Sequence, residues 1–177
     1  MYPVKLRGQL VTLREFRLDD IDAAQHVVGD DEVTRWLSFD SRSPEATADM
    51  VTGAIERAKL TPRSEYYLAV ADDDDQLIGF ARLGLGGVQA AKLGYAVRAD
   101  QWGNGYATDA CRILIDFAFG PLGLHRITAA IGPDNAASIA VVRKLGMEYE
   151  GRLRDHVHTN GNWRDSDLYA RLAVAGA

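Results

Sequence analysis

The sequence predicts an α+β fold in which helices cover both faces of a central mixed β-sheet. Runs of residues with the two-residue alternation of half-buried strands recur along the chain. Runs with apolar residues at helical spacing stand between them, but strands and helices do not alternate strictly. Such a mixed order favours a sheet that is partly antiparallel and partly parallel.

Length and composition predict one domain over residues 1–177. A chain of 177 residues with 47% apolar content can bury a substantial core. It has no run of about 18 apolar residues and no basic-then-apolar leader, so we expect a cytoplasmic protein without a membrane partner. The net charge of −5 argues against nucleic-acid binding and mildly favours cationic partners.

The first half of the chain shows one alternating strand and several helix starts. Apolar residues at helical spacing follow side chains that can cap a helix, and Pro44 stands where a first turn tolerates proline. The expected elements are a strand over 9–16, a short helix capped by Asp19 or Asp20, another over 32–37, and a longer helix from Ser43 to Lys59.

The second half completes a seven-stranded sheet. The expected elements are strands over 66–71, 76–85, 88–97, 127–131, 147–158 and 163–172, and helices from about Tyr106 and over 135–145. The aspartates from Asp72 to Asp75 are typical of a solvated hairpin tip. Four consecutive acids cannot all point at one ion, so no metal site is predicted.

The most informative stretch is 95–108, where a strand passes through a glycine-bearing turn into a helix. Gly103 and Gly105 let the backbone approach a ligand without an intervening Cβ. The helix that follows presents unpaired N–H groups and the positive end of its macrodipole. The turn is therefore typical of a phosphate-binding site.

Two common phosphate-binding motifs do not fit this turn. In a dinucleotide fingerprint Thr108 would have to be Gly or Ala, and an acidic residue should follow about 20 positions later. A P-loop is excluded because no Gly-Lys-Ser/Thr follows.

The helix after the turn is predicted to bury one face. Its apolar residues recur at helical spacing, whereas Asp109, Arg112 and Asp116 fall elsewhere and are expected to face water. Cys111, the one cysteine of the sequence, lies on the apolar face. It is expected to be a small buried hydrophobe rather than a nucleophile.

The segment from Trp102 to Ala107 resembles the acyl-CoA-binding motif of the GNAT superfamily of acetyltransferases, Gln/Arg-x-x-Gly-x-Gly/Ala. Its first position departs from the pattern, because Trp102 stands in place of Gln or Arg. The form Trp-Gly-x-Gly-Tyr-Ala-Thr is similar to the branch that contains the ribosomal-protein N-terminal acetyltransferases. Further segments similar to that branch follow in the same order, at 123–127, 134–138, 143–151 and 161–172.

The resemblance implies the GNAT fold, a mostly antiparallel seven-stranded mixed sheet with a splayed parallel pair. Acetyl-CoA would be the co-substrate, its pantetheine arm in the wedge between the splayed strands and its pyrophosphate on main-chain N–H groups of the turn. The implied cofactor-binding residues are Tyr95, Ala96, Val97, Trp102, Gly103, Asn104, Gly105, Tyr106, Ala107, Thr108, Asn135 and Ser138.

The resemblance also implies catalytic roles. Asn135 is explained by a helix cap, or it contacts the pantetheine, whereas the Ser138 hydroxyl can donate a proton to the departing thiolate. Related enzymes carry a glutamate where Val157 aligns, so its neighbours Asp155, His156 and His158 are the alternative bases. Strand alternation would place His156 and His158 on one face. The predicted catalytic residues are Ser138, His156 and His158.

The acceptor side of the cleft would be formed by the first-half helices and the last hairpin. The predicted acceptor-binding residues are Trp36, Leu37, Phe39, Asp40 and Trp163, aromatic for shape and acidic to attract a cation. Two functions stay open: an N-acetyltransferase that acts on a protein N-terminus or a small-molecule amine, and a non-catalytic acyl-CoA-binding module. The partners considered are the amine acceptor and, in a homodimer, a second copy of the chain.

Overall fold

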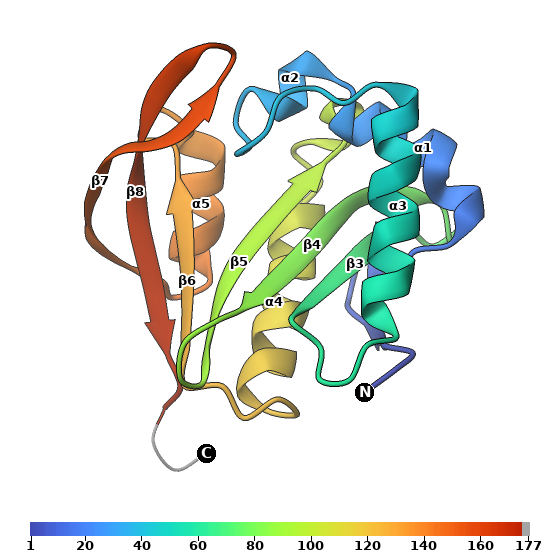
Figure 1. Ribbon diagram of the computed structural model, residues 1–177. Helices are drawn as coiled ribbons and strands as arrows, with labels where there is room; N and C mark the ends of the chain where they lie inside the picture. Colours follow the sequence, from blue (N-terminus) through green and yellow to red (C-terminus); the bar gives the residue numbers. More distant parts are fainter. Residues whose placement is uncertain (175–177) are drawn as a thin grey trace.

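The computed structural model describes residues 1–174, which form eight strands and five α-helices (Figure 1). The strands are β1 Lys5–Arg7, β2 Thr12–Arg14, β3 Glu65–Ala71, β4 Leu77–Leu85, β5 Ala90–Val97, β6 Arg126–Ile131, β7 Glu148–Thr159 and β8 Asn162–Leu172. The helices are α1 Ile21–Val28, α2 Asp31–Thr34, α3 Pro44–Ala58, α4 Tyr106–Phe119 and α5 Ala136–Lys144, with 3₁₀ turns η1 Leu18–Asp20 and η2 Ala99–Gln101.

The described strands form one mixed sheet in the order β1-β2-β3-β4-β5-β6-β8-β7. Every neighbouring pair is antiparallel except β5 and β6, so the predicted α+β class is confirmed. The predicted number of strands is wrong by one, because β1 pairs with β2 at the edge of the sheet. A strand of three residues is too short for alternation to reveal it.

The parallel pair separates along its length. Strands β5 and β6 are paired only from Ala90 with Arg126 to Lys92 with Thr128. Beyond that point β5 pairs with β4 alone, and β6 pairs with β8 alone. The C-terminal halves of the two strands therefore splay apart and leave a wedge in the middle of the sheet (Figure 1).

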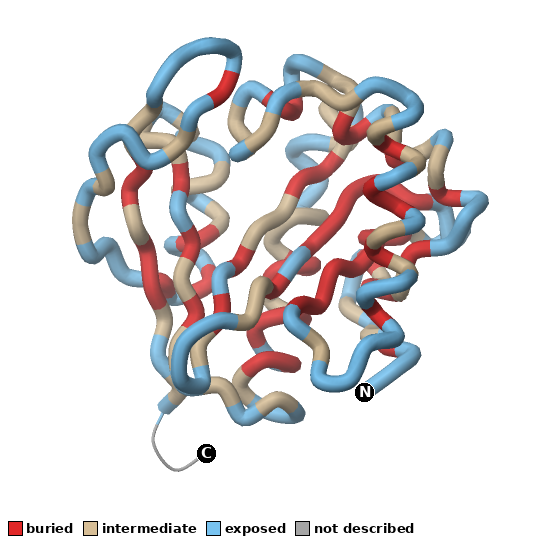
Figure 2. The backbone as a smooth tube through the Cα atoms, in the orientation of Figure 1, coloured by how far each residue is buried: buried red, intermediate tan, exposed pale blue. Residues whose placement is uncertain are grey.

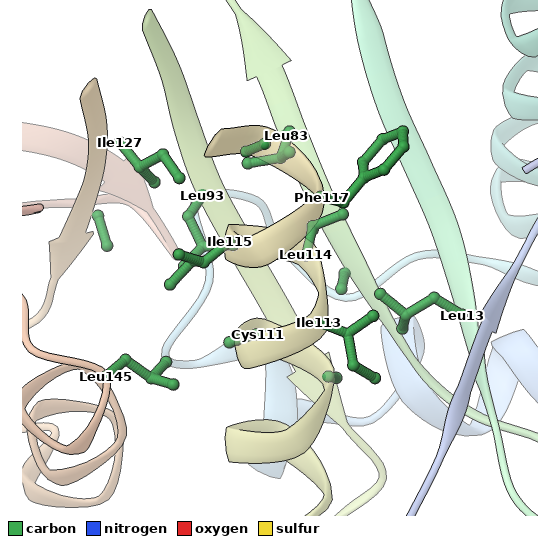
Figure 3. Packing of buried hydrophobic residues seen from close by; sticks show 14 of the residues in the cluster. Leu13, Leu83, Leu93, Cys111, Ile113, Leu114, Ile115, Phe117, Ile127 and Leu145 are labelled. Carbon is green, nitrogen blue, oxygen red and sulfur yellow. The ribbon is translucent and has the colours of Figure 1, made fainter. Parts of the chain in front are cut away.

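Helices cover both faces of the sheet, as predicted. On one face α4 and α5 pack against apolar side chains of the central strands, and Figure 3 shows Leu114 and Ile115 of α4 in this cluster. On the other face lie α1 and α3. Strand β3 is buried along its whole length (Figure 2), because Leu68 and Val70 face one cluster while Tyr67 faces the other.

Two expectations about acidic side chains are wrong. Asp109 is only 5% exposed, because its carboxylate accepts hydrogen bonds from the N–H groups of Leu10 (2.8 Å) and Val11 (3.2 Å) and from Arg112. It thereby ties the segment before β2 to α4. Asp20 does not cap α1 with its side chain, which instead accepts from the Arg14 guanidinium at 2.8 Å.

The other turn and cap assignments follow local chemistry. The Ser43 hydroxyl accepts from the N–H of Ala46 at the start of α3, while the Asp72 carboxylate closes the hairpin tip by accepting from Asp74 and Gln76. In residues 1–174 no three His, Cys, Asp or Glu side chains are grouped to hold a metal. No helix within those residues combines the length and apolar character needed to cross a membrane.

Candidate active site

A cleft of about 810 Å³ follows the splay between β5 and β6. Its walls come from β5, β6 and β8, from the turn before α4, from one side of α5, and from the segment after α2. Residues from both halves of the chain therefore meet in one hollow at the centre of the sheet.

The free edge of β5 lines the wedge with main-chain groups. The N–H of Arg98 donates to Ile78 O on β4 at 2.8 Å. Because successive strand amides point in opposite directions, the N–H groups of Tyr95 and Val97 point away from β4 into the wedge. The Val97 carbonyl, on the same side, accepts from the Trp102 indole N–H at 2.8 Å. Trp102 thus holds the turn against the end of β5.

The turn before α4 presents a set of free main-chain donors. Gly103 and Gly105 have φ angles of +81° and +82°, which glycine adopts without strain. Among the described residues, none accepts from the N–H groups of residues 103–108. These donors and the positive end of α4 fit a pyrophosphate. The Asn104 side chain donates to Gln101 O and does not line the cleft.

The start of α5 closes the other side of the wedge. The Asn135 side chain caps the helix by accepting from the Ser138 N–H at 3.1 Å. The Tyr95 hydroxyl donates to Ser138 O at 3.3 Å and so joins β5 to α5. Burial raises the pKa of Tyr95, which keeps its phenol neutral and able to donate. All three residues line the cleft.

A bulge in β7 overturns the alternation expected there. Leu153 lies opposite Ser166 and Val157 opposite Arg164, so three residues of β7 stand against one of β8. As a result His156 and its neighbour Val157 both line the cleft. His158 lies opposite Trp163, on the other face of the strands from Arg164 and Ser166, and does not line the cleft.

His156 is held by a buried hydroxyl. Its Nδ1 lies 3.0 Å from Ser166 Oγ on β8, and Ser166 is only 3% exposed. His158 instead packs against Trp163 with tilted rings, whose centroids are 4.8 Å apart, and both side chains are exposed. Of the two predicted histidines, only His156 stands at the wedge.

Residues 11–148 match the family described as an acetyltransferase (GNAT) domain. That range includes the wedge, the glycine turn and the start of α5. The chain belongs to the GNAT family of acetyltransferases.

Relatives support the same assignment over most of the chain. The uncharacterized N-acetyltransferase p20 of Bacillus licheniformis is 28% identical over 94% of this chain and 95% of its own length. The [ribosomal protein uS5]-alanine N-acetyltransferase of Escherichia coli is 32% identical over 60% of this chain and 57% of its own. The chain is accordingly an N-acetyltransferase, and the expected kinship with ribosomal-protein acetyltransferases is confirmed.

A solved relative contains a CoA species. Mycobacterium smegmatis RimJ, determined in complex with CoA-disulfide, superposes with a TM-score of 0.85 at 26% identity. The superposition covers 97% of this chain and 88% of that one. Binding of CoA by a structural neighbour agrees with the fit of the glycine turn to a pyrophosphate.

In this GNAT enzyme contacts between distant segments close the end of the cleft where the acceptor residues are predicted. The Arg164 guanidinium on β8 donates to Arg35 O at 2.7 Å and to Leu37 O. The Asp40 carboxylate accepts from the Asn160 N–H, 2.8 Å away in the β7–β8 hairpin. The segment after α2 is thereby fastened to the last two strands.

The predicted acceptor residues divide into two groups. Trp36 and Leu37 line the cleft, whereas Phe39, Asp40 and Trp163 do not. Phe39 lies beneath the Arg42 guanidinium, 4.6 Å from its ring centroid, and the Asp40 carboxylate is occupied by Asn160. Trp163 is 63% exposed on the hairpin.

Several cleft residues were not found from the sequence. Arg164, Ser166 and Leu168 all line the cleft at two-residue spacing on β8. That spacing was a usable signal, since it places the three side chains on one face of a strand. Arg82 and Lys92 also line the cleft, on β4 and β5, and no local pattern marks them.

Proposed function

We propose that this enzyme transfers an acetyl group from acetyl-CoA to a primary amine by direct attack in a ternary complex. The observation that carries the proposal is a single cleft that joins the free N–H groups before α4, the open edge of β5, and His156. The acceptor is the α-amine of a protein N-terminus or a small-molecule amine. The named activity of the Escherichia coli relative makes ribosomal N-terminal peptides the first acceptors to test.

The chain's own donors would hold the co-substrate in an extended path. Main-chain N–H groups from Gly103 to Thr108 would bind the pyrophosphate. Acetyl-CoA supplies the activated acetyl group. The N–H groups of Tyr95 and Val97 lie where they can stabilise the negative charge that develops on the carbonyl oxygen during attack.

His156 and Ser138 would move the protons. In the tautomer we assign, His156 Nδ1–H donates to Ser166 Oγ, so Nε2 is free to take a proton from the amine directly or through water. The Ser138 hydroxyl, at the start of α5, would donate a proton to the departing thiolate. Asn135 would act as the cap of α5 and as a contact to the pantetheine.

Thiol release from acetyl-CoA tests the proposal. A panel of ribosomal N-terminal peptides, polyamines and aminoglycosides should reveal amine-dependent release, with the acetylated product identified by mass spectrometry. Tight acetyl-CoA binding without turnover of any amine would instead support the non-catalytic acyl-CoA-binding module. We place the reaction in the cytoplasm, and light scattering of the purified chain checks for the homodimer.

A further inference from the structure

The charged side chains that line the cleft all carry positive charge. They are Arg82, Lys92, Lys144 and Arg164, and among the described residues no Asp or Glu lines it. The chain as a whole carries a net charge of −5, so the cleft differs in sign from the protein around it. A local field of this kind concentrates anions rather than cations.

Two of these cations lie on one face of the sheet, at diagonal positions of neighbouring strands. Lys92 of β5 lies opposite Gly84 of β4, and Arg82 lies opposite Gly94. The Arg82 guanidinium is 3.9 Å from the point where a Cβ on Gly84 would stand, so it lies above the residue that faces Lys92 across the strands, while its Nε bonds to Glu65 on β3. A Cβ on Gly94 would meet nothing within 4 Å, so the space above Gly94, next to both cations, is unfilled by protein atoms.

The positive charge of this pair is only partly neutralised inside the protein. Arg82 forms an ion pair with Glu65, but Arg57 shares the same carboxylate. Lys92 is exposed and takes part in none of the ion pairs of residues 1–174. The Glu65 carboxylate therefore pairs with two guanidiniums, and the Lys92 ammonium is available to bind a ligand.

The pair lies away from the expected pyrophosphate site. The Arg82 guanidinium stands over the ring of Tyr67, 5.9 Å from its centroid, on the face covered by α3, whereas α4 packs on the opposite face. Along β5, Lys92 is three residues, about 10 Å at about 3.3 Å per residue, from Tyr95, whose N–H we propose for the carbonyl oxygen, and it is farther from the glycine turn after β5. Lys92 and Arg82 therefore lie at the base of the wedge, on the face opposite α4, where they are available to an acceptor rather than to the pyrophosphate.

Resting on the proposed amine acetylation, we propose that the acceptor carries a carboxylate close to its reactive amine, and that Lys92 and Arg82 bind this carboxylate. Lys92 is the last residue of β5 that pairs with β6, so the cations stand where the wedge opens. Thr128, opposite Lys92, lines the cleft with them and offers a hydroxyl donor. The class comprises peptides with an acidic first residue and free amino acids.

Matched pairs of acceptors show whether the carboxylate belongs to the first side chain of a peptide or to a free amino acid. One pair is a peptide that begins with Asp and the same peptide that begins with Asn; the other pair is alanine and alaninamide. For each pair kcat/KM is measured by thiol release from acetyl-CoA. We expect the anionic member of at least one pair to be favoured about tenfold, since a hydrogen bond to a charged group is worth about 1.5–3 kcal/mol.

Substitution of Lys92 tests whether this residue causes the preference for anionic acceptors. Lys92→Gln should lower the anionic-to-neutral ratio about tenfold, with the melting temperature and acetyl-CoA affinity measured on the same sample to verify folding. Lys59→Gln is the matched control, because Lys59 is exposed at the end of α3, pairs with Glu56 and lies outside the cleft. It should leave the ratio unchanged.

The outcomes distinguish the two proposals. Equal kcat/KM for both members of both pairs would overturn the carboxylate assignment and leave acetyl transfer standing. Absence of thiol release with every amine would overturn acetyl transfer itself. An anionic-to-neutral ratio of kcat/KM that is unchanged in Lys92→Gln would show that Lys92 does not bind the carboxylate. A preference for succinyl-CoA over acetyl-CoA that depends on Lys92, without acceptor preference, would also overturn it, since the cations would then serve the donor.

Discussion

Ser138 combines two main-chain contacts with a hydroxyl that neither contact uses. Its N–H donates to the Asn135 cap and its carbonyl accepts from Tyr95. Both bonds persist when the hydroxyl is removed, so a structural role and a chemical role can be separated at this residue.

We expect Ser138→Ala to lower kcat about 10²-fold, the low end of the range for general-acid assistance. A thiol with a pKa of about 8.5 is already a tolerable leaving group near neutral pH, which limits the loss. Melting temperature and acetyl-CoA affinity should stay unchanged, because the main-chain bonds remain. An unchanged kcat on a sample of unaltered stability would contradict the catalytic role.

Asp109 is a second residue at which one effect can be measured by itself, here the contribution of an ionised carboxylate to the stability of the fold. Burial tends to raise the pKa of its carboxyl, but hydrogen bonds from Leu10, Arg112 and Val11 outweigh burial and hold that pKa below its ordinary value. The ionised form therefore stabilises the fold above the ordinary pKa of about 3.9, and this contribution is lost as pH falls through the lowered pKa.

Asp109→Asn should lower the free energy of unfolding by about 1–3 kcal/mol at neutral pH, because buried N–H groups lose a charged acceptor. The difference from the unsubstituted chain should hold above about pH 5 and narrow below about pH 4. Urea denaturation at several pH values measures it. Asp116→Asn, an exposed neighbour on α4, is the control and should change stability by less than about 0.5 kcal/mol. Equal effects of both substitutions would contradict the role of Asp109.

At the scale of elements, the glycine turn and α4 act as one unit. Gly105 precedes the helix with φ +82°, and a Cβ there would lie 3.4 Å from Leu10 Cδ1. A left-handed conformation costs a non-glycine residue about 1–2 kcal/mol, and a β-branched residue more. The orientation of the free N–H groups therefore depends on glycine at this position.

Gly105→Val should abolish measurable CoA binding, because the turn must change shape to relieve strain. Asn104→Ala should change the Kd for CoA by less than about threefold, since that side chain donates to Gln101 O and does not line the cleft. Calorimetric titration of both variants with CoA makes the comparison. Retained affinity in a folded Gly105→Val protein, or a large loss in Asn104→Ala, would show that side chains rather than main-chain N–H groups hold the pyrophosphate.

Strand β7 shows how an element can depart from its local pattern. Alternation places His156 and His158 together, but the bulge adds residues on β7 without partners on β8. Asp155 reaches a positive φ of 46°, and its N–H bonds to the Asp165 side chain. The bulge turns His156 toward Ser166, a contact that the β7 sequence alone does not indicate.

At the scale of the whole molecule, Arg164 connects parts of the chain that are far apart in sequence. Its guanidinium binds two carbonyls of the segment after α2, which carries Trp36 and Leu37 into the cleft. A lysine has the same charge but cannot make the forked pair of hydrogen bonds.

Arg164→Lys should raise KM for the amine acceptor about tenfold and leave KM for acetyl-CoA unchanged, because the donors that we propose for the pyrophosphate lie before α4. Steady-state kinetics with each substrate varied in turn measures both constants. Arg7→Lys, at an exposed position on β1, is the matched control and should leave both unchanged. A parallel rise in both KM values would indicate general distortion of the fold rather than a local effect on the segment that carries Trp36 and Leu37.

The sequence by itself determined the α+β class, the glycine turn, the capped starts of α3 and α5, and the acidic hairpin tip. Each of these depends on interactions within a few residues: φ preference, capping, and the spacing of apolar side chains. The family resemblance rested on the same local segments. Such features persist in nearly any tertiary context and can be recognised in the chain alone.

Only the tertiary structure decided the β7 bulge, the burial of Asp109, the Arg164 link and the placement of Lys92 and Arg82 on one face of the sheet. Each depends on strand register or on contacts between distant residues: Asp109 lies 98 positions from Val11, and Arg164 lies 129 from Arg35. Register is set by the packing of whole strands, and one added residue reverses the face of those that follow. The sign of charge in the cleft therefore came from the assembled sheet, although the net charge of the sequence pointed the other way.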